Sequence, residues 1–262
     1  MTRALTSDRT RQIATVLIFV ITVAINGAAN ALPVNGQTTG EVSDRFAVFV
    51  IPAGYVFGIW GLIYLGLLAF TVYQALHGSD PIVRRLGWLP ALTGVLNTTW
   101  LLLFQFELFV LTVPVMIALL LTLITIHLRS WAMRDALNTT TRWTIRYPFS
   151  IYLGWITVAT IANIAQTLSS IGVGGFGLEV ETAIAGVVLL IGLAIAVSFV
   201  YRFRDVAYGA VIVWAYAGIV VKEMDTPIVP VVAGLGVLVV AALIALVIID
   251  RLRGGPTLLP AT

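Results

Sequence analysis

The stretch that decides the fold runs from Pro52 to Tyr73 without a charged residue, and it begins Pro52-Ala53-Gly54-Tyr55-Val56-Phe57-Gly58-Ile59-Trp60-Gly61-Leu62-Ile63-Tyr64. A helix needs roughly 20 mostly apolar residues to cross a bilayer, so this stretch is long enough to span one. Successive residues of a helix are 100° apart, which groups side chains into faces. An aromatic face would hold Phe57, Trp60 and Tyr64, and an adjacent small-residue face would hold Gly54, Gly58 and Gly61.

Each face has two interpretations. Small residues in a membrane helix let a neighbouring helix approach closely, and aromatic side chains are then part of the packing. Alternatively, the aromatic face lines a pocket for a ligand. The helix by itself favours packing, because aromatic stripes more often belong to a core.

The composition identifies an integral membrane protein. Of the 262 residues, 60% are hydrophobic and only 10% are charged, whereas a soluble domain has roughly 25% charged residues. Apolar runs recur along the whole chain, so no segment remains for a soluble domain. The chain has no cysteine, which excludes disulfides, thiolate catalysis and cysteine metal sites.

Eight apolar runs predict an all-α, polytopic helix bundle with eight membrane spans. The expected spans cover residues 13–32, 52–77, 86–106, 108–128, 147–169, 182–201, 206–221 and 227–249. The seventh is short. Lys222 is followed by Glu223, Asp225 and Pro227, so we expect it at the end of that helix with its ammonium group reaching water.

The first span and the loop after it carry polar residues. Asn26 and Asn30 lie one turn apart, and amides inside a membrane need partners, so this face is expected to point into the bundle. Residues 33–51 form a polar connection that is long for a compact bundle. A loop of that length is more often functional or flexible than a plain connector.

The distribution of positive charge predicts the topology. Lys and Arg concentrate in cytoplasmic loops. With eight spans and the N-terminus inside, the cytoplasmic segments hold 13 of the 15 basic residues, and only Arg45 and Lys222 lie outside. Both termini are therefore expected in the cytoplasm of a cell with a bacterial-type plasma membrane. The net charge of +3 reflects this topology, so no nucleic-acid partner is expected.

Motifs for catalysis or metal binding are missing from the sequence. Charged residues fall in loops or at span ends, which argues against a proton-coupled pump. The chain has no metal-diphosphate motif, no helical zinc-protease motif and no serine nucleophile motif. We therefore expect no catalytic residue, no metal site and no required cofactor.

Aromatic and amide side chains recur on two further spans. One stripe holds Thr93, Asn97, Trp100 and Phe104, and another holds Tyr152, Trp155, Ala159, Asn163 and Gln166. A buried indole or amide group must find a partner where water is absent. These groups could bond between helices, or they could line a pocket for a flat, largely apolar ligand. The residues alone do not separate the two interpretations.

The same residues resemble the translocator protein family, known in bacteria as TspO or the tryptophan-rich sensory proteins. The second-span motif is matched by Pro52, Tyr55, Phe57, Trp60 and Tyr64. The third-span motif appears as Leu96-Asn97-Thr98-Thr99-Trp100 with Leu103-Phe104, and the fifth-span motif as Trp155, Ala159-Thr160 and Asn163. Ala53 and Tyr55 stand where that family has proline and tryptophan.

The resemblance implies a five-helix bundle at 1–169, whose long first loop closes over a pocket. The translocator proteins end after five helices, so the three additional spans expected at 170–262 depart from that family. The resemblance also implies that the pocket binds porphyrins, other haem-related tetrapyrroles or sterol-like lipids. The candidate ligand-binding residues are Tyr55, Phe57, Trp60, Tyr64, Asn97, Trp100, Trp155, Ala159 and Asn163. Membrane lipid is a further partner, and members of the family are often homodimers.

The function expected from the sequence is binding, with a sensory, regulatory or transport role. Two alternatives remain open. The protein could be a membrane enzyme that alters the bound tetrapyrrole or lipid, or a transporter or permease subunit in which the last three spans form a gate or a partner surface.

Overall fold

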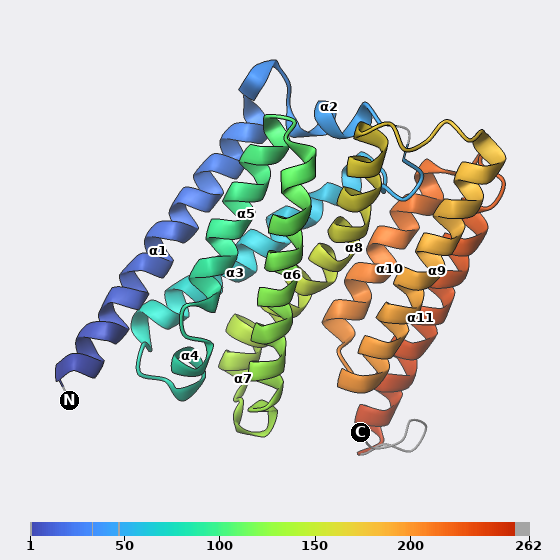
Figure 1. Cartoon of the computed structure of the whole chain (residues 1–262). Coiled ribbons are helices and arrows are strands. Elements are labelled where there is room, and N and C mark those ends of the chain that lie inside the picture. Colours follow the sequence, from blue (N-terminus) through green and yellow to red (C-terminus); the bar gives the residue numbers. More distant parts are fainter. Residues whose placement is uncertain (1, 33, 47, 255–262) are drawn as a thin grey trace. The chain divides into compact units, whose positions relative to one another are not determined.

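The structure is a computed structural model that describes residues 2–32, 34–46 and 48–254. Helix makes up 83% of the described residues, which contain no strand, and this confirms the all-α class. A helix lies at each of the eight expected positions (Figure 1): α1 (Thr2–Ala31), α3 (Ile59–Leu76), α5 (Leu89–Gln105), α6 (Phe109–Trp131), α8 (Tyr147–Ser170), α9 (Leu178–Phe203), α10 (Val206–Lys222) and α11 (Val229–Leu252).

The count of eight spans is not confirmed. Among the described residues, six segments are long and apolar enough to cross a membrane: Asp8–Ala29, Gly54–Leu76, Phe109–Trp131, Thr139–Ser170, Leu178–Phe203 and Val229–Leu252. Helices α5 and α10 have 17 residues each. At 1.5 Å per residue each is about 26 Å long, which is less than a hydrocarbon core of about 30 Å.

Short elements connect these helices: η1 (Val34–Gly36), α2 (Thr39–Asp44), η2 (Gly54–Gly58), α4 (Pro81–Leu86), η3 (Arg134–Ala136), α7 (Thr139–Thr141) and η4 (Arg142–Arg146). Helix α2 begins with a capping box, in which Thr38 and Glu41 satisfy each other's backbone N–H groups. Helix α4 begins with Asp80 as its N-cap, followed by Pro81. The long polar loop after α1 is therefore partly helical.

The stretch from Pro52 to Tyr73 does not begin as an α-helix. Residues Gly54–Gly58 form a 3-10 helix, and the α-helix starts at Ile59. A 3-10 helix has three residues per turn, so the 100° spacing applies only from Ile59 onward. The predicted common face of Phe57, Trp60 and Tyr64 therefore stays a prediction at Phe57.

The chain divides into two compact units. The first unit comprises Met1–Arg45 and Trp60–Leu153, and the second comprises Phe46–Ile59 and Gly154–Thr262. The division runs through α8, between Leu153 and Gly154. These limits differ from the boundary at 169 and 170 expected from the sequence, which stays a prediction.

Helices of the first unit approach closely at small residues. A Cβ atom at Gly66 would lie 2.8 Å from Cβ of Pro148, so α3 and the start of α8 are in direct backbone contact. At Gly94 of α5 a Cβ atom would lie 2.6 Å from Ile18 of α1. Helices α5 and α6 are joined by a tight turn in which Glu107 has φ +60°, as the break expected there requires.

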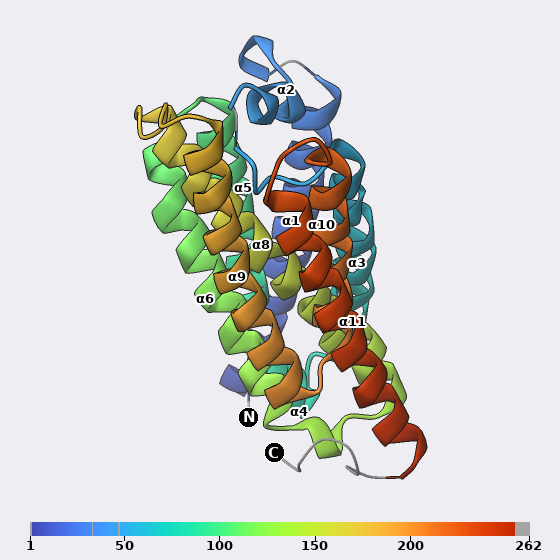
Figure 2. The same ribbon diagram turned by 90° about the vertical axis from the view of Figure 1, so that its right-hand side faces the viewer.

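Helices α9, α10 and α11 of the second unit lie side by side, as both ribbon views show (Figure 1 and Figure 2). A Cβ atom at Gly236 of α11 would lie 2.5 Å from the ring of Tyr216 on α10. Lys222 is the last residue of α10 and is exposed, which confirms its predicted place at a helix end.

The glycines between Pro52 and Tyr73 do not bring a neighbouring helix close. Within its own unit, a Cβ atom at Gly54, Gly58 or Gly61 would meet no atom within 4 Å. The interpretation that these three glycines let another helix of the same unit approach closely is therefore wrong. Close approach occurs at other glycines, because the position of the neighbouring helix decides it.

Candidate functional site

Two predicted site residues, Trp60 and Tyr64, belong to a cluster in the first unit. Their rings stack with centroids 5.5 Å apart and an interplanar angle of 21°. The ring of Tyr152, on the first turns of α8, meets Trp60 edge-on with centroids 6.0 Å apart. Tyr152 is 1% exposed, so the cluster lies inside the unit.

Amides continue this cluster toward α1 and α5. The side chains of Asn97 and Tyr64 lie near the hydroxyl group of Tyr152. Asn97 is 1% exposed, and its Oδ1 accepts a hydrogen bond of 3.0 Å from Nδ2 of Asn26. This bond confirms that Asn26 points into the bundle. The side chain of Asn30 lies outside the described residues.

Two polar atoms of the cluster have no hydrogen-bond partner within the part of the chain that the structure describes. Oη of Tyr64 and Nδ2 of Asn97 are both buried and unpaired. A buried polar group without a partner costs about 1 to 3 kcal/mol, so such groups call for an explanation. Both atoms can donate, so a ligand oxygen placed between these side chains could accept hydrogen bonds from them.

Trp100 lies one turn beyond Asn97 on α5. Its ring stacks on Phe104 with centroids 5.2 Å apart, and Phe104 meets Phe109 of α6 edge-on at 5.6 Å. Four of the nine predicted residues, Trp60, Tyr64, Asn97 and Trp100, thus belong to the first unit. The structure directly joins the first three through Tyr152.

The loop after α1 is held to the end of α5 by one buried glutamine. Gln105 is 1% exposed, and its Nε2 donates to the carbonyl groups of Val34, at 2.7 Å, and of Gln37. Its Oε1 accepts from the hydroxyl group of Thr39 at 3.2 Å. A 2.9 Å ion pair between Arg45 and Glu107 adds a second attachment. The sequence contained no signal for this role beyond a glutamine at the end of an apolar run.

Glu41 stabilises the helix inside this loop. Its carboxylate accepts the backbone N–H of Thr38 at 2.6 Å and the Thr38 hydroxyl at 2.9 Å. These bonds lower the pKa of Glu41 below its ordinary value, because they favour the charged form. The residue is exposed, so it supports the loop and does not line the buried cluster.

A small pocket lies between α1, α3 and α5 of the first unit. Four buried threonine hydroxyls line it, and each donates to a backbone carbonyl: Thr15, Thr22, Thr71 and Thr93. Their protons are already used, so these oxygens can only accept. The pocket suits water or another hydrogen-bond donor, in contrast to the donors at Tyr64 and Asn97.

Five predicted residues lie in the second unit: Tyr55, Phe57, Trp155, Ala159 and Asn163. Phe57 meets Trp155 edge-on with centroids 5.5 Å apart, and Tyr55 meets Trp214 of α10 at 5.4 Å. Trp155 is buried, whereas Tyr55 and Phe57 are exposed by 52% and 37%. The side chain of Asn163 donates to Thr167 one turn along the same helix.

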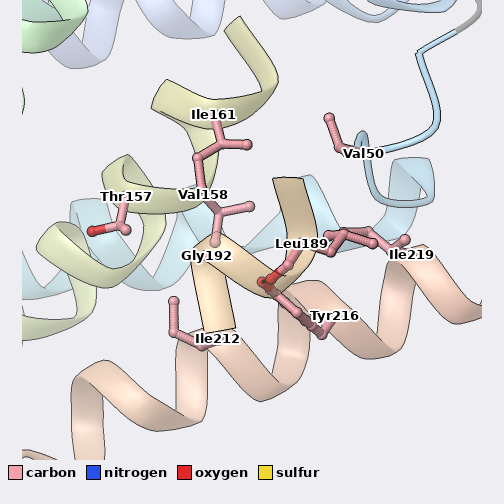
Figure 3. Close-up of a pocket in the computed structure, with 9 residues that line it drawn as sticks. All are labelled: Val50, Thr157, Val158, Ile161, Leu189, Gly192, Ile212, Tyr216 and Ile219. Atoms are coloured by element: carbon pink, nitrogen blue, oxygen red, sulfur yellow. Dashed lines mark hydrogen bonds between the residues drawn. The ribbon is translucent and has the colours of Figure 1, made fainter. Parts of the chain in front are cut away.

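The second unit also has a small pocket, shown in Figure 3. Its walls are aliphatic, with Val158 of α8 pointing toward Gly192 of α9. The two hydroxyl groups in the lining are engaged: Tyr216 donates to the carbonyl of Leu189 at 2.7 Å, and Thr157 accepts from Tyr208 at 3.3 Å. An apolar cavity without available polar groups stays dry and offers no specific hydrogen bond to a ligand.

Neither pocket is lined by any of the nine predicted residues. The shared pocket expected from the resemblance stays a prediction. Tyr152 belongs to the stripe expected on the fifth span, but it is not among the nine candidate ligand-binding residues. Within the described residues, no group of three or more His, Asp or Glu could hold a metal ion.

Comparison with known proteins places these observations in a family. The model of the TSPO-like protein family matches residues 12–249, which cover all eight helices and not only the first five. The last three helices are therefore part of what that family has in common. No curated protein and no solved structure matches the chain. The chain is a multi-pass membrane protein and belongs to the TSPO-like protein family.

Proposed function

We propose that this membrane protein binds a planar, largely apolar ligand of the tetrapyrrole class. Sensing, regulation or transport would follow from binding. The observation that carries the proposal is the pair of buried, unpaired donors, Oη of Tyr64 and Nδ2 of Asn97, beside the stacked rings of Trp60 and Tyr64. A ligand must supply a flat apolar body for the rings and an oxygen acceptor for the donors.

Tetrapyrroles meet both requirements, because their macrocycle is flat and their side chains carry carboxylates. Ring stacking contributes about 0.5 to 1.5 kcal/mol per aromatic pair beyond the burial of area. Trp60 and Tyr64 would contact the macrocycle, and Asn97 would orient its polar edge. Trp100, Tyr55, Phe57, Trp155, Ala159 and Asn163 enter the proposal through the resemblance to translocator proteins, as does a homodimer.

A titration of the purified protein with protoporphyrin IX, followed by quenching of tryptophan fluorescence, tests the proposal. Tyr64→Phe removes only a hydroxyl group that has no partner, so the variant should keep or slightly raise the melting temperature. A lost hydrogen bond of about 0.5 to 1.5 kcal/mol should weaken binding roughly 2- to 13-fold.

Tyr216→Phe is the matched control. It also removes one buried hydroxyl group, but this group donates to the carbonyl of Leu189 in the second unit. The control should lose about 1 kcal/mol of stability and keep its affinity for protoporphyrin IX. The proposal fails if binding is not saturable, or if Tyr64→Phe and Trp60→Phe both bind as tightly as the wild type. A spectral change of the bound porphyrin with time would favour the enzyme alternative.

A further inference from the structure

A cluster of arginines lies where three helices of the second unit meet. It includes the end of α9, the start of α10 and the end of α11, and it contains Arg202, Arg204, Arg251 and Arg253. The acidic residues there are Asp205, the N-cap of α10, and Asp250. Four arginines and two aspartates leave a net charge of 4 − 2 = +2 at this end of the unit.

Arg204 is held at the centre of this cluster. Its backbone has φ +49°, an uncommon conformation for a residue with a side chain, and it caps the end of α9. Its Nη2 lies 2.6 Å from Oδ2 of Asp250, which is fully buried. Arg251 donates to the carbonyl of Arg204. The guanidinium group is thus fixed in orientation before any ligand binds.

The other terminal nitrogen of Arg204, Nη1, is not used in the ion pair with Asp250. Nη1 is buried and has no hydrogen-bond partner among the described residues. Asp250 already compensates the charge through Nη2, so Nη1 calls for a neutral or anionic acceptor. Exposed guanidinium groups of Arg251 and Arg253 belong to the same end of α11. Guanidinium forks match the oxygens of a phosphate group.

The position of the cluster in the membrane favours the phosphate of a lipid headgroup over free phosphate. Helices α9 and α11 are both apolar enough to span a membrane, and both end at these arginines, which places them at the depth of lipid headgroups. Exposed apolar side chains precede them on the same two helices: Tyr201, Ile248, Ile249 and Leu252. Lipid chains can cover these side chains, whereas free phosphate cannot.

We propose that this arginine cluster is a binding site for the phosphate headgroup of an anionic phospholipid. Arg204 presents Nη1 to a phosphate oxygen, and Arg202, Arg251 and Arg253 supply the surrounding positive charge. The acyl chains lie along the exposed apolar faces of α9 and α11. This site is independent of the tetrapyrrole proposal, because it shares no residue with it.

The test compares the full-length protein in nanodiscs of phosphatidylcholine alone and of phosphatidylcholine and phosphatidylglycerol in equal parts. Native mass spectrometry then counts the phosphatidylglycerol molecules that stay bound. Each basic residue near a membrane surface contributes roughly a fivefold change in affinity for acidic lipid. The double variant Arg202→Gln, Arg253→Gln should therefore retain phosphatidylglycerol at least tenfold less well.

Two further variants make the test specific. Arg9→Gln with Arg85→Gln removes the same charge from exposed positions of the first unit and should change retention less than twofold. Arg204→Lys keeps the ion pair with Asp250 but lacks the second nitrogen, so it should stay folded and retain less phosphatidylglycerol. The proposal fails if the Arg9 and Arg85 control loses as much phosphatidylglycerol as the Arg202 and Arg253 variant. It also fails if Arg204→Lys and the Arg202 and Arg253 variant both retain as much phosphatidylglycerol as the wild type. Displacement of the lipid by millimolar inorganic phosphate would show an ion site and not a lipid site.

Discussion

The two compact units hold their helices together with different chemistry. In the first unit, side-chain hydrogen bonds join α1 to its neighbours: Asn26 to Asn97, Thr22 to the carbonyl of Gly94, and Gln12 to the carbonyl of Gln74. Glycines bring helices close in both units, at Gly66 and Gly94 in the first and at Gly192 and Gly236 in the second. Among the described residues, side-chain hydrogen bonds from α1 are the feature of the first unit alone.

Both solutions answer the same physical problem. Lipid tails are as apolar as leucine, so membrane helices associate through close packing and through hydrogen bonds between helices. The difference matters for function. Polar interiors can leave donors unpaired, as at Tyr64 and Asn97, whereas the second unit uses the buried hydroxyl groups of Tyr208 and Tyr216 in internal hydrogen bonds. Recognition of a polar ligand edge therefore fits the first unit.

The largest expected effect tests whether the second unit depends on the buried ion pair between Arg204 and Asp250. Arg204→Ala would leave Asp250 buried without its 2.6 Å partner. Removing one member of a buried ion pair costs about 3 to 5 kcal/mol. We expect a clear fall in the melting temperature in detergent, and a partial recovery in Arg204→Ala with Asp250→Asn. An unchanged melting temperature would mean that Asp250 is not held as described.

The next effect tests packing at glycine. Gly236→Ala drives a methyl group into the ring of Tyr216 and should cost about 1 to 3 kcal/mol. Gly61→Ala in α3 is the matched control, because it meets no atom of its own unit within 4 Å. It should be neutral or gain up to about 1 kcal/mol from helix propensity. Thermal unfolding of both variants measures this difference, and equal melting temperatures would contradict the close contact at Gly236.

A smaller effect concerns the loop that Gln105 holds in the first unit. Gln105→Leu removes the bonds to Val34, Gln37 and Thr39 and leaves their polar groups to find water. We expect a loss of about 1 to 3 kcal/mol that is confined to this loop. Faster hydrogen exchange in residues 34–45, with unchanged exchange in α9 to α11, would confirm it. Uniformly faster exchange would show that the loop and the helices unfold together.

The smallest effect is a difference in pH response between the units. Bonds from Thr38 lower the pKa of Glu41, whereas burial raises the pKa of Glu223, an effect that Lys222 partly offsets. Glu41 therefore stabilises its unit above the ordinary pKa of 4.5, and this contribution disappears as the pH falls through the lowered pKa. Glu223 costs stability above its raised pKa, because the folded state disfavours its charge, and this cost disappears as the pH falls toward 4.5.

Melting temperatures measured from neutral pH downward check both signs. At neutral pH, Glu41→Gln should lower the melting temperature and Glu223→Gln should raise it. The Glu223→Gln difference should vanish once the pH is below 4.5, and the Glu41→Gln difference should vanish at lower pH. Two variants that shift in the same direction would contradict the opposite environments of the two carboxyl groups.

The sequence predicted much of the fold correctly. Runs of apolar residues located all eight helices, because the length and hydropathy of a helix are local properties. The break at Glu107, the helix end at Lys222 and the inward face of Asn26 were also readable from local rules. The site was harder. Trp60, Tyr64 and Asn97 were named, but Tyr152, which joins them, was left out of the set.

By itself, the sequence determined that the chain is an all-helical membrane protein, which residues are in the helices, and which family motifs they carry. Only the tertiary structure decided which glycines touch a neighbour, that Gln105 holds the loop, and which donors stay unpaired. It also divided the nine candidate residues between two units. The physical reason is that helix formation depends on residues within a few turns, whereas contacts and unsatisfied hydrogen bonds depend on segments that lie far apart in the chain.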